Sequence, residues 1–175
     1  MIVSVLCAAR NSVYKTLPGV EVYDAARDAR TFPGDTPVIA HPPCRAWSAF
    51  LRHQAKPAEG EMELGLWCAE QLRKCGGVLE QPAHSHLFQA AGLPQPGTRV
   101  GELWSLRVWQ VWWGHINRKD TWLCFSKVPS EAIDIPLRLH AIGGDNRRWK
   151  LHKRMRSASP PLFARWLVEA ARSVV

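Results

Sequence analysis

Three side chains that could support covalent chemistry lie directly after predicted strands. The apolar run 36–40 leads through His41 to Cys44, and the run 78–80 ends at Glu80. Ligands of open α/β sheets bind at the carboxyl ends of the parallel strands, so we expect these three residues at one edge. A thiol beside a histidine and a carboxylate can act as a nucleophile with acid–base support. The alternatives are a buried, inert Cys44, a His41 that only orders its loop, and a Glu80 that caps a turn.

Two earlier strands bring polar residues to the same edge. The first predicted strand, 2–7, is followed by Arg10 and Asn11, and the second, 20–24, ends at Asp24. An acid in this position is typical of the ribose-binding carboxylate of nucleotide-binding α/β folds. We therefore name Asp24, Arg10 and Asn11 as candidate cofactor-binding residues, with a surface turn acid as the alternative for Asp24.

Strands alternate with helices in the first half of the chain, which favours a parallel sheet with crossovers. An aromatic pair of strands in the second half predicts an antiparallel hairpin. We expect one α/β domain over residues 1–175 with a Rossmann-like, mostly parallel sheet and the hairpin at one edge. The predicted elements are strands 2–7, 20–24, 36–40 and 78–80, a helix over 59–75, a hairpin of 103–113 with 121–126, and a helix from 160 to about 173.

The pattern within the two long helices predicts their buried faces and their starts. In the helix over 59–75, Met62, Leu66, Ala69 and Leu72 share one face. Ser159 can cap the last helix.

Composition and net charge limit the classes of partner that the chain is expected to bind. The chain has 175 residues, a net charge of +8 and five cysteines without a C-x-x-C pair. The charge favours an anionic partner, nucleic acid first. No apolar run approaches the roughly 20 residues of a membrane-spanning helix. The cysteine pattern indicates neither a disulfide framework nor a metal site, and a reducing cytoplasm is the expected location.

The strongest basic cluster lies in a predicted loop over 143–158. We expect it to contact the phosphates of a nucleic acid, and a solvated basic loop is the alternative. Its candidate contact residues are Arg147, Arg148, Lys150, Lys153 and Arg154.

Several of these motifs together resemble a known family. The segment 42–48 reads Pro-Pro-Cys-Arg-Ala-Trp-Ser and is similar to the Pro-Pro-Cys loop of cytosine-C5 DNA methyltransferases. Glu-Gln-Pro at 80–82 resembles that family's Glu-Asn motif, 110–123 resembles its later Gln- and Arg-containing strand, and 159–167 resembles its closing helix. The resemblance covers most of the chain and implies a small, phage-encoded member with a reduced methyltransferase-type sheet.

The resemblance implies a role for each motif residue. Cys44 would add as a thiolate to C6 of a pyrimidine, which makes C5 nucleophilic, while Glu80 would hold and protonate N3. His41 and Arg45 would lower the pKa of Cys44, and Arg118 would hold phosphate or the ring carbonyl. The implied substrate- or DNA-binding residues are Pro43, Arg45, Trp47, Ser48, Gln81, Trp113 and Lys119.

Two departures from the family leave the function open. No glycine follows the first strand, which argues against S-adenosylmethionine, although Asp24 keeps this cofactor as a candidate. The length leaves no room for a separate target-recognition domain. The first hypothesis is therefore an enzyme that methylates or hypermodifies a pyrimidine of phage DNA. The alternatives are a non-catalytic protein that binds nucleic acid or a host protein, and an enzyme that acts on a free pyrimidine nucleotide.

Overall fold

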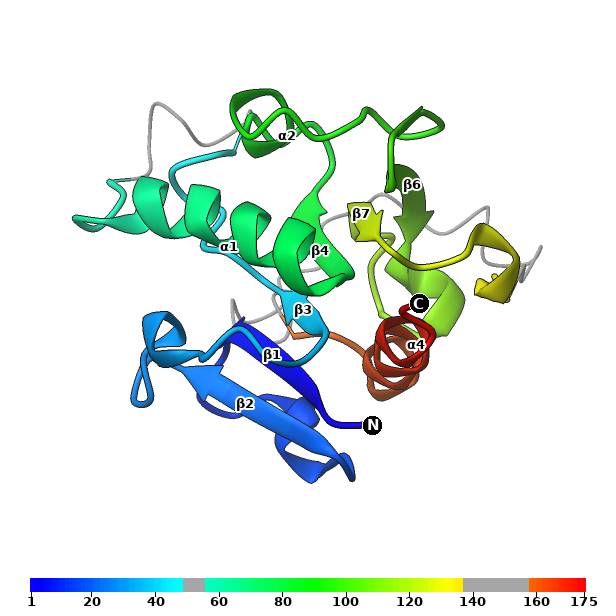
Figure 1. The fold of residues 1–175 in the computed structure, drawn as a ribbon, viewed down its shortest axis with the longest axis horizontal. Coiled ribbons are helices and arrows are strands. Elements are labelled where there is room, and N and C mark those ends of the chain that lie inside the picture. Colours follow the sequence, from blue (N-terminus) through cyan, green and yellow to red (C-terminus); the bar gives the residue numbers. More distant parts are fainter. Residues whose placement is uncertain (49–55, 137–157) are drawn as a thin grey trace.

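The computed structural model describes residues 1–48, 56–136 and 158–175, and these form one mixed sheet with helices on both faces (Figure 1). The strands are β1 Val3–Ala8, β2 Val20–Asp24, β3 Val38–Ala40, β4 Gly77–Pro82, β5 Arg99–Val100, β6 Leu103–Trp109 and β7 Asp120–Ser126. The helices are α1 Glu61–Cys75, α2 Leu87–Ala90 and α4 Pro161–Arg172, with short 3-10 turns η1 Val13–Thr16, η2 Ala29–Thr31, η3 Gln110–Trp113 and η4 Ser130–Ala132.

The sheet runs in the order β2-β1-β3-β4-β7-β6-β5. β2, β1, β3 and β4 pair in parallel, whereas the pairings of β4 with β7, β7 with β6 and β6 with β5 are antiparallel. The α/β class and the antiparallel pairing of β6 with β7 confirm the sequence-based expectation. The expected mostly parallel sheet is confirmed only in part, because the hairpin pairs directly with β4 and so makes half of the sheet antiparallel.

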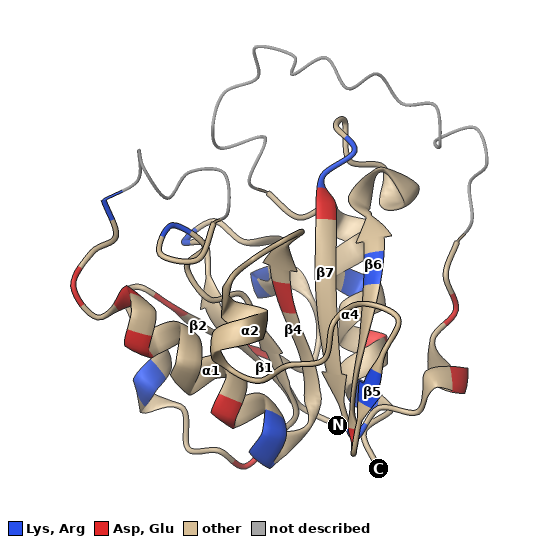
Figure 2. Ribbon diagram, turned by 90° about the horizontal axis from the view of Figure 1, so that it is seen from above, with Lys and Arg blue, Asp and Glu red and all other residues tan. Residues whose placement is uncertain are grey.

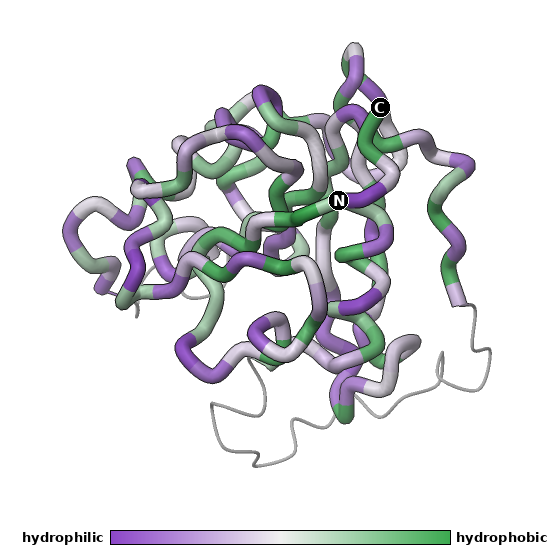
Figure 3. The backbone as a smooth tube through the Cα atoms, turned by 60° about the horizontal axis from the view of Figure 1, so that its bottom comes forward, coloured by the Kyte–Doolittle hydropathy of each residue, from purple (hydrophilic) through white to green (hydrophobic). Residues whose placement is uncertain are grey.

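Two cores lie on opposite faces of the sheet. Side chains alternate between the faces of a strand, and along β3 this sends Ile39 to one core and Val38 and Ala40 to the other. The first core includes α4 and η1, and the second includes α1 and α2. Figure 3 shows the hydrophobic and hydrophilic residues alternating along much of the backbone, as expected for elements with one buried face.

β4 packs closely beside β3 because it begins with a glycine. Gly77 has a φ of +115°, and a Cβ at this position would lie 2.0 Å from the carbonyl oxygen of Val38. No other residue type fits that contact without displacing the strand. The glycine therefore sets the close pairing that brings the ends of β3 and β4 together.

The buried face of α1 and the N-cap of α4 both differ from the predicted ones. In α1, Ala69 and Leu72 are buried as expected, but Met62 and Leu66 are 49% and 37% exposed. The inward positions instead include Glu61 and Gly65. The helix is rotated because Trp47 from the preceding loop packs against Gly65. In α4 the N-cap is Pro160, which has no side-chain donor or acceptor, so the predicted Ser159 cap is wrong.

No helix within the described ranges is long and apolar enough to cross a membrane.

Candidate active site at the carboxyl ends of β3 and β4

The chain leaves β3 at Ala40, which pairs with Leu79 of the parallel strand β4. His41 and Glu80 each follow one residue later, so the register places them side by side. Two prolines come next and force the backbone into an extended path toward Cys44. Figure 2 shows the acidic position within β4 and the basic segment directly before β7, the next strand of the sheet, whose first residue is acidic. The local sequence thus delivers a histidine, a thiol and a carboxylate to one edge.

A chain of hydrogen bonds holds Glu80 in place. His41 Nδ1 lies 3.1 Å from Glu80 Oε2, and His41 Nε2 lies 3.1 Å from the hydroxyl of Tyr14. On the other side, Gln110 Nε2 donates to Glu80 Oε1 at 3.0 Å and to the Thr121 hydroxyl at 3.1 Å. These partners come from η1, the residue directly after β3, η3 and β7, so the orientation of the carboxylate depends on contacts far apart in the sequence.

The charge of Glu80 is retained despite its burial. Desolvation by burial raises the pKa of this carboxyl, but the His41 hydrogen bond, the positive charge of Lys119 and the Gln110 hydrogen bond together lower it below its ordinary value. An ionised carboxylate only accepts hydrogen bonds, so His41 carries a proton on Nδ1. Burial, together with the charge of Glu80, raises the pKa of Tyr14 well above its ordinary value, so its phenol keeps its proton.

The electrostatic surroundings of Cys44 differ from the expectation. Cys44 is half-buried, and burial, followed by the charges of Glu80 and Glu61, raises its pKa rather than lowering it. The two groups expected to lower it are engaged elsewhere, since His41 is bonded to Glu80 and Arg45 forms an ion pair with Glu61. The positive charge of Lys119 acts in the opposite direction and lowers the pKa of Cys44. The resting thiol is therefore protonated.

The ammonium of Lys119 interacts electrostatically with Glu80 and Cys44. Burial lowers the pKa of its ammonium, while the charges of Glu80 and Cys44 raise it. Its Nζ also donates to the carbonyl of Ala158 at 3.2 Å. Arg118, which we expected in the cationic role, lies with its guanidinium 3.9 Å above the Trp109 ring. The structure therefore points to Lys119 as the cation that acts on both the thiol and the carboxylate.

Gln81 holds the Pro-Pro-Cys loop to β4. Its buried amide donates to the carbonyl of Pro42 at 2.7 Å and accepts from the Ser85 hydroxyl at 3.0 Å. Its side-chain amide is thus engaged within the protein, which makes it a positioning residue rather than the substrate-binding residue that we expected. Pro43 and Ser48, in the same loop, are half-buried.

The two tryptophans expected to bind substrate or DNA are both buried. Trp113 is 4% exposed, and its ring lies 5.0 Å from Phe163 and 4.7 Å from Trp166, measured between centroids. It belongs to the core, which argues against the expected binding role. Trp47 is also 4% exposed, but its indole forms one wall of a cavity.

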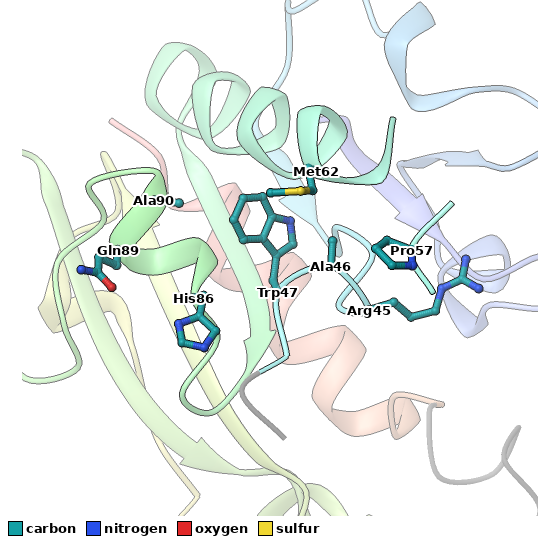
Figure 4. Close-up of a pocket in the computed structure, with 8 residues that line it drawn as sticks. All are labelled: Arg45, Ala46, Trp47, Pro57, Met62, His86, Gln89 and Ala90. Carbon is teal, nitrogen blue, oxygen red and sulfur yellow. The ribbon is translucent and has the colours of Figure 1, made fainter. Parts of the chain in front are cut away.

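That cavity lies between the Cys44 loop, the start of α1 and α2, and has a volume of about 540 Å³ (Figure 4). The indole of Trp47 lies beside Met62, and its buried Nε1 has no hydrogen-bond partner among the residues that the structure describes. Cys44 and Glu80 are not among the residues that line it. The lining residues are Arg45, Ala46, Trp47, Pro57, Met62, His86, Gln89 and Ala90.

The carboxyl end of β2 has a different arrangement. Asp24 Oδ2 lies 2.6 Å from Lys15 Nζ, and Asp24 Oδ1 accepts from the backbone N–H groups of Ala26 and Arg27 at 2.9 and 3.2 Å. The Lys15 hydrogen bond and these backbone bonds lower the pKa of Asp24 to about 2. The geometry therefore matches the alternative that Asp24 is a turn acid.

The residues after β1 do not fit S-adenosylmethionine. Arg10 and Asn11 are exposed, and Cys7, with a φ of +60°, occupies the backbone conformation that favours glycine. Both oxygens of Asp24 are already bonded within the chain.

Two residues of the site were not among the sequence-based candidates. Tyr14 gave no signal, because it lies between two predicted strands in a segment without a recognised motif. Gln110 had one usable signal, since it is a polar residue within the predicted aromatic strand 103–113. The structure shows its side chain fully buried. The basic-loop candidates Arg147, Arg148, Lys150, Lys153 and Arg154 lie outside the described residues.

In the described ranges, no three or more His, Cys, Asp or Glu side chains form a group that could hold a metal ion. No protein-family model matches the chain, and searches of curated proteins and of solved structures found no significant match.

Proposed function

We propose that this chain modifies a pyrimidine base of DNA at the 5-position, with Cys44 as the nucleophile and Glu80 at N3. The observation that carries the proposal is the 3.1 Å contact of His41 with Glu80 at the adjoining ends of β3 and β4, with Cys44 three residues after His41. The charges of Glu80 and Lys119 both act on the Cys44 thiol. A thiol, a fixed carboxylate and a cation in one place supply a nucleophile, a proton carrier and a stabilising charge.

The sheet order supports a Rossmann-like, methyltransferase-type arrangement. From β1 the chain first adds β2 on one side and then β3 on the other. In open α/β sheets this reversal marks the crevice where ligands bind, beyond the carboxyl ends of the strands. Tyr14 follows β1, and His41 and Cys44 follow β3, so the proposed catalytic group borders this crevice.

The covalent step balances without a further reagent. The Cys44 proton passes to the ionised carboxylate of Glu80 as Sγ forms a bond to C6 of the base. The electrons of the C5–C6 double bond form a C4–C5 double bond, and those of the C4–N3 double bond take the proton from Glu80 at N3. This produces an enamine with a nucleophilic C5. Lys119 favours the step because its charge stabilises the thiolate and the carboxylate.

The simplest electrophile for this enamine is a proton from water. C5 gains a solvent proton and loses its original hydrogen as a proton. The N3 proton then returns through Glu80 to Sγ as the C6–Sγ bond breaks and the ring regains its double bonds. The net result is exchange of the C5 hydrogen, which needs no cofactor. Methyl transfer and hypermodification would both begin with the same addition, so this exchange tests the step that they share.

The substrate class follows from charge. A net charge of +8 exceeds what one nucleotide phosphate requires and favours a polyanion. We therefore propose DNA as the substrate, with cytosine as the base because its N3 lacks a proton and can receive one from Glu80.

The test is exchange of the C5 hydrogen of cytosine in a DNA oligonucleotide incubated in deuterated buffer, followed by mass spectrometry of the released nucleosides. We expect exchange with the native chain and none with Cys44→Ala. Cys75→Ala is the matched control because Cys75, on α1, is another half-buried cysteine and plays no part in the step. Absence of exchange with the native chain, or exchange that persists in Cys44→Ala, would overturn the proposal.

One observation favours a second candidate, a non-catalytic DNA-binding protein. The raised pKa of Cys44 leaves a protonated thiol, which is a weak nucleophile. This candidate predicts DNA affinity that falls steeply with salt and is the same for the native chain, Cys44→Ala and Glu80→Gln. Retained affinity without C5 exchange would favour it over the enzyme.

A further inference from the structure

A second pair of cysteines lies away from the proposed catalytic group. Cys7, at the carboxyl end of β1, has its sulfur 3.7 Å from that of Cys68, in the middle of α1. Both are reduced, and they form the one sulfur–sulfur contact among the described residues. The two positions are 61 residues apart, so the contact is created by packing of α1 on the sheet.

The two thiols differ in access. Cys68 is fully buried, whereas Cys7 is half-buried and lies near the carboxyl end of β1. A small disulfide from solution can therefore reach Cys7 first. Cys68 then lies within contact distance of the sulfur that has been modified, which is the arrangement of an attacking and a resolving cysteine.

The distance that must close is small. The sulfurs must move from 3.7 Å to the roughly 2.05 Å of a disulfide. Cys7 lies at a break in the β1–β2 register, between Leu6 and Ala8, with a φ of +60°. A bulge residue is not held in the regular ladder, so its side chain can adjust without breaking a run of strand pairs.

We propose that Cys7 and Cys68 are a disulfide-forming pair that a low-molecular-weight disulfide such as glutathione disulfide oxidises selectively. Cys7 Sγ attacks one glutathione sulfur, forming a mixed disulfide and releasing one glutathione thiolate. Cys68 Sγ then attacks Cys7 Sγ and releases the second. The two cysteines lose two electrons and two protons, and glutathione disulfide becomes two glutathione thiols. This inference is independent of the proposed function, because it involves neither Cys44 nor Glu80.

The bond would join the end of β1 to α1. Closing a loop of this length reduces the freedom of the unfolded chain and should raise the thermal midpoint by roughly 10 °C. It would also tie the helix that carries Glu61, the ion-pair partner of Arg45, to the sheet edge that the proposed site borders.

The test uses the full chain, glutathione disulfide, an alkylating quench and tryptic mass mapping. Cleavage sites in the sequence leave each of the five cysteines on its own peptide. We expect one major cross-link, between the peptides with Cys7 and Cys68, and its loss in Cys7→Ser. Cys75→Ser is the matched control on the same helix and should leave the cross-link unchanged.

Three results would overturn the proposal. One is glutathione attached to Cys7 without a cross-link, and another is Cys7 linked equally to Cys44, Cys75 or Cys124. The third is an oxidised chain that melts below the reduced one, which would mean that the bond forms only by distorting the fold. Cys68→Ala, which keeps the site apolar, should retain the fold and accumulate glutathione on Cys7.

Discussion

Two acids near the carboxyl ends of strands, Asp24 in β2 and Glu80 in β4, have different surroundings. The loop after Asp24 folds back, so that its own N–H groups and Lys15 occupy both carboxylate oxygens. Glu80 is held by His41 and Gln110, whose donors come from other elements, and it acts electrostatically on a thiol. Both acids have a lowered pKa. A lowered pKa therefore does not identify a site, whereas the origin of the donors and the presence of a nucleophile distinguish the two ends.

The largest expected effect is on C5 exchange, which substitution of Glu80 should reduce and substitution of Asp24 should not. Glu80→Gln keeps the size of the side chain but cannot carry the proton to N3, so C5 exchange should fall by about 10²- to 10⁴-fold. Asp24→Asn is the matched control and should change exchange less than about twofold, because Asp24 only closes its turn. Equal losses in the two variants, measured on the same oligonucleotide, would remove the distinction.

The next largest effect is expected from Lys119, on the pH dependence of C5 exchange. Lys119→Met removes a charge that lowers the pKa of both Cys44 and Glu80, so the rise of exchange with pH should move to higher pH. At neutral pH we expect a loss of roughly tenfold, which corresponds to about one pKa unit of the thiol.

Arg118→Met is the matched control, because it removes the stack on Trp109 instead. Its cost should be about 0.5–1 kcal/mol of stability, with an unshifted pH profile. A shift in Arg118→Met as large as that in Lys119→Met would contradict the assignment.

A stability prediction tests how the Cys44 loop is held. A Cβ on Gly65 would lie 2.4 Å from Trp47 Nε1, so Gly65→Ala must displace the indole and the loop with it. Overpacking of this kind costs about 1–3 kcal/mol, against a helix-propensity gain of about 1 kcal/mol, and we expect net destabilisation in urea unfolding. Leu66→Ala, at an exposed position of α1, should change stability less. A more stable Gly65→Ala variant would show that this packing is not required.

The smallest expected effect is a pH dependence at the Asp24 end. The pKa of Asp24 is about 2 in the folded chain against 3.8 for a free side chain. Its ion pair therefore stabilises the fold fully above pH 3.8, and this contribution is lost as the pH falls toward 2. The thermal midpoints of the native chain and Asp24→Asn should thus differ at neutral pH and converge on acidification. A constant difference across this range would contradict the assigned pairing.

Much of the fold was predictable from local pattern. The apolar runs located β1 to β4, and the alternating aromatic segment located the hairpin of β6 and β7. The same positions placed His41, Cys44 and Glu80 at strand ends. The insertion of β7 directly beside β4 was not predictable, because strand pairing depends on contacts that no local periodicity encodes.

Apolar spacing predicted only part of the buried face of α1. It correctly placed Ala69 and Leu72 inside, but in the folded chain Met62 and Leu66 face outward and Gly65 faces inward. Apolar residues cover more than one face of α1, so the pattern allows more than one rotation. The flat indole of Trp47 selects the rotation, since only glycine leaves room for it.

Local sequence pattern places a thiol, a histidine and two acids at or near the carboxyl ends of strands in an α/β sheet. Packing of elements far apart in the chain selects which acid is enclosed by its own turn and which cation acts on the thiol. This follows because a buried polar atom must be satisfied by whichever donors packing brings to it. For Glu80 those donors lie 39 residues before and 30 residues after it in the chain.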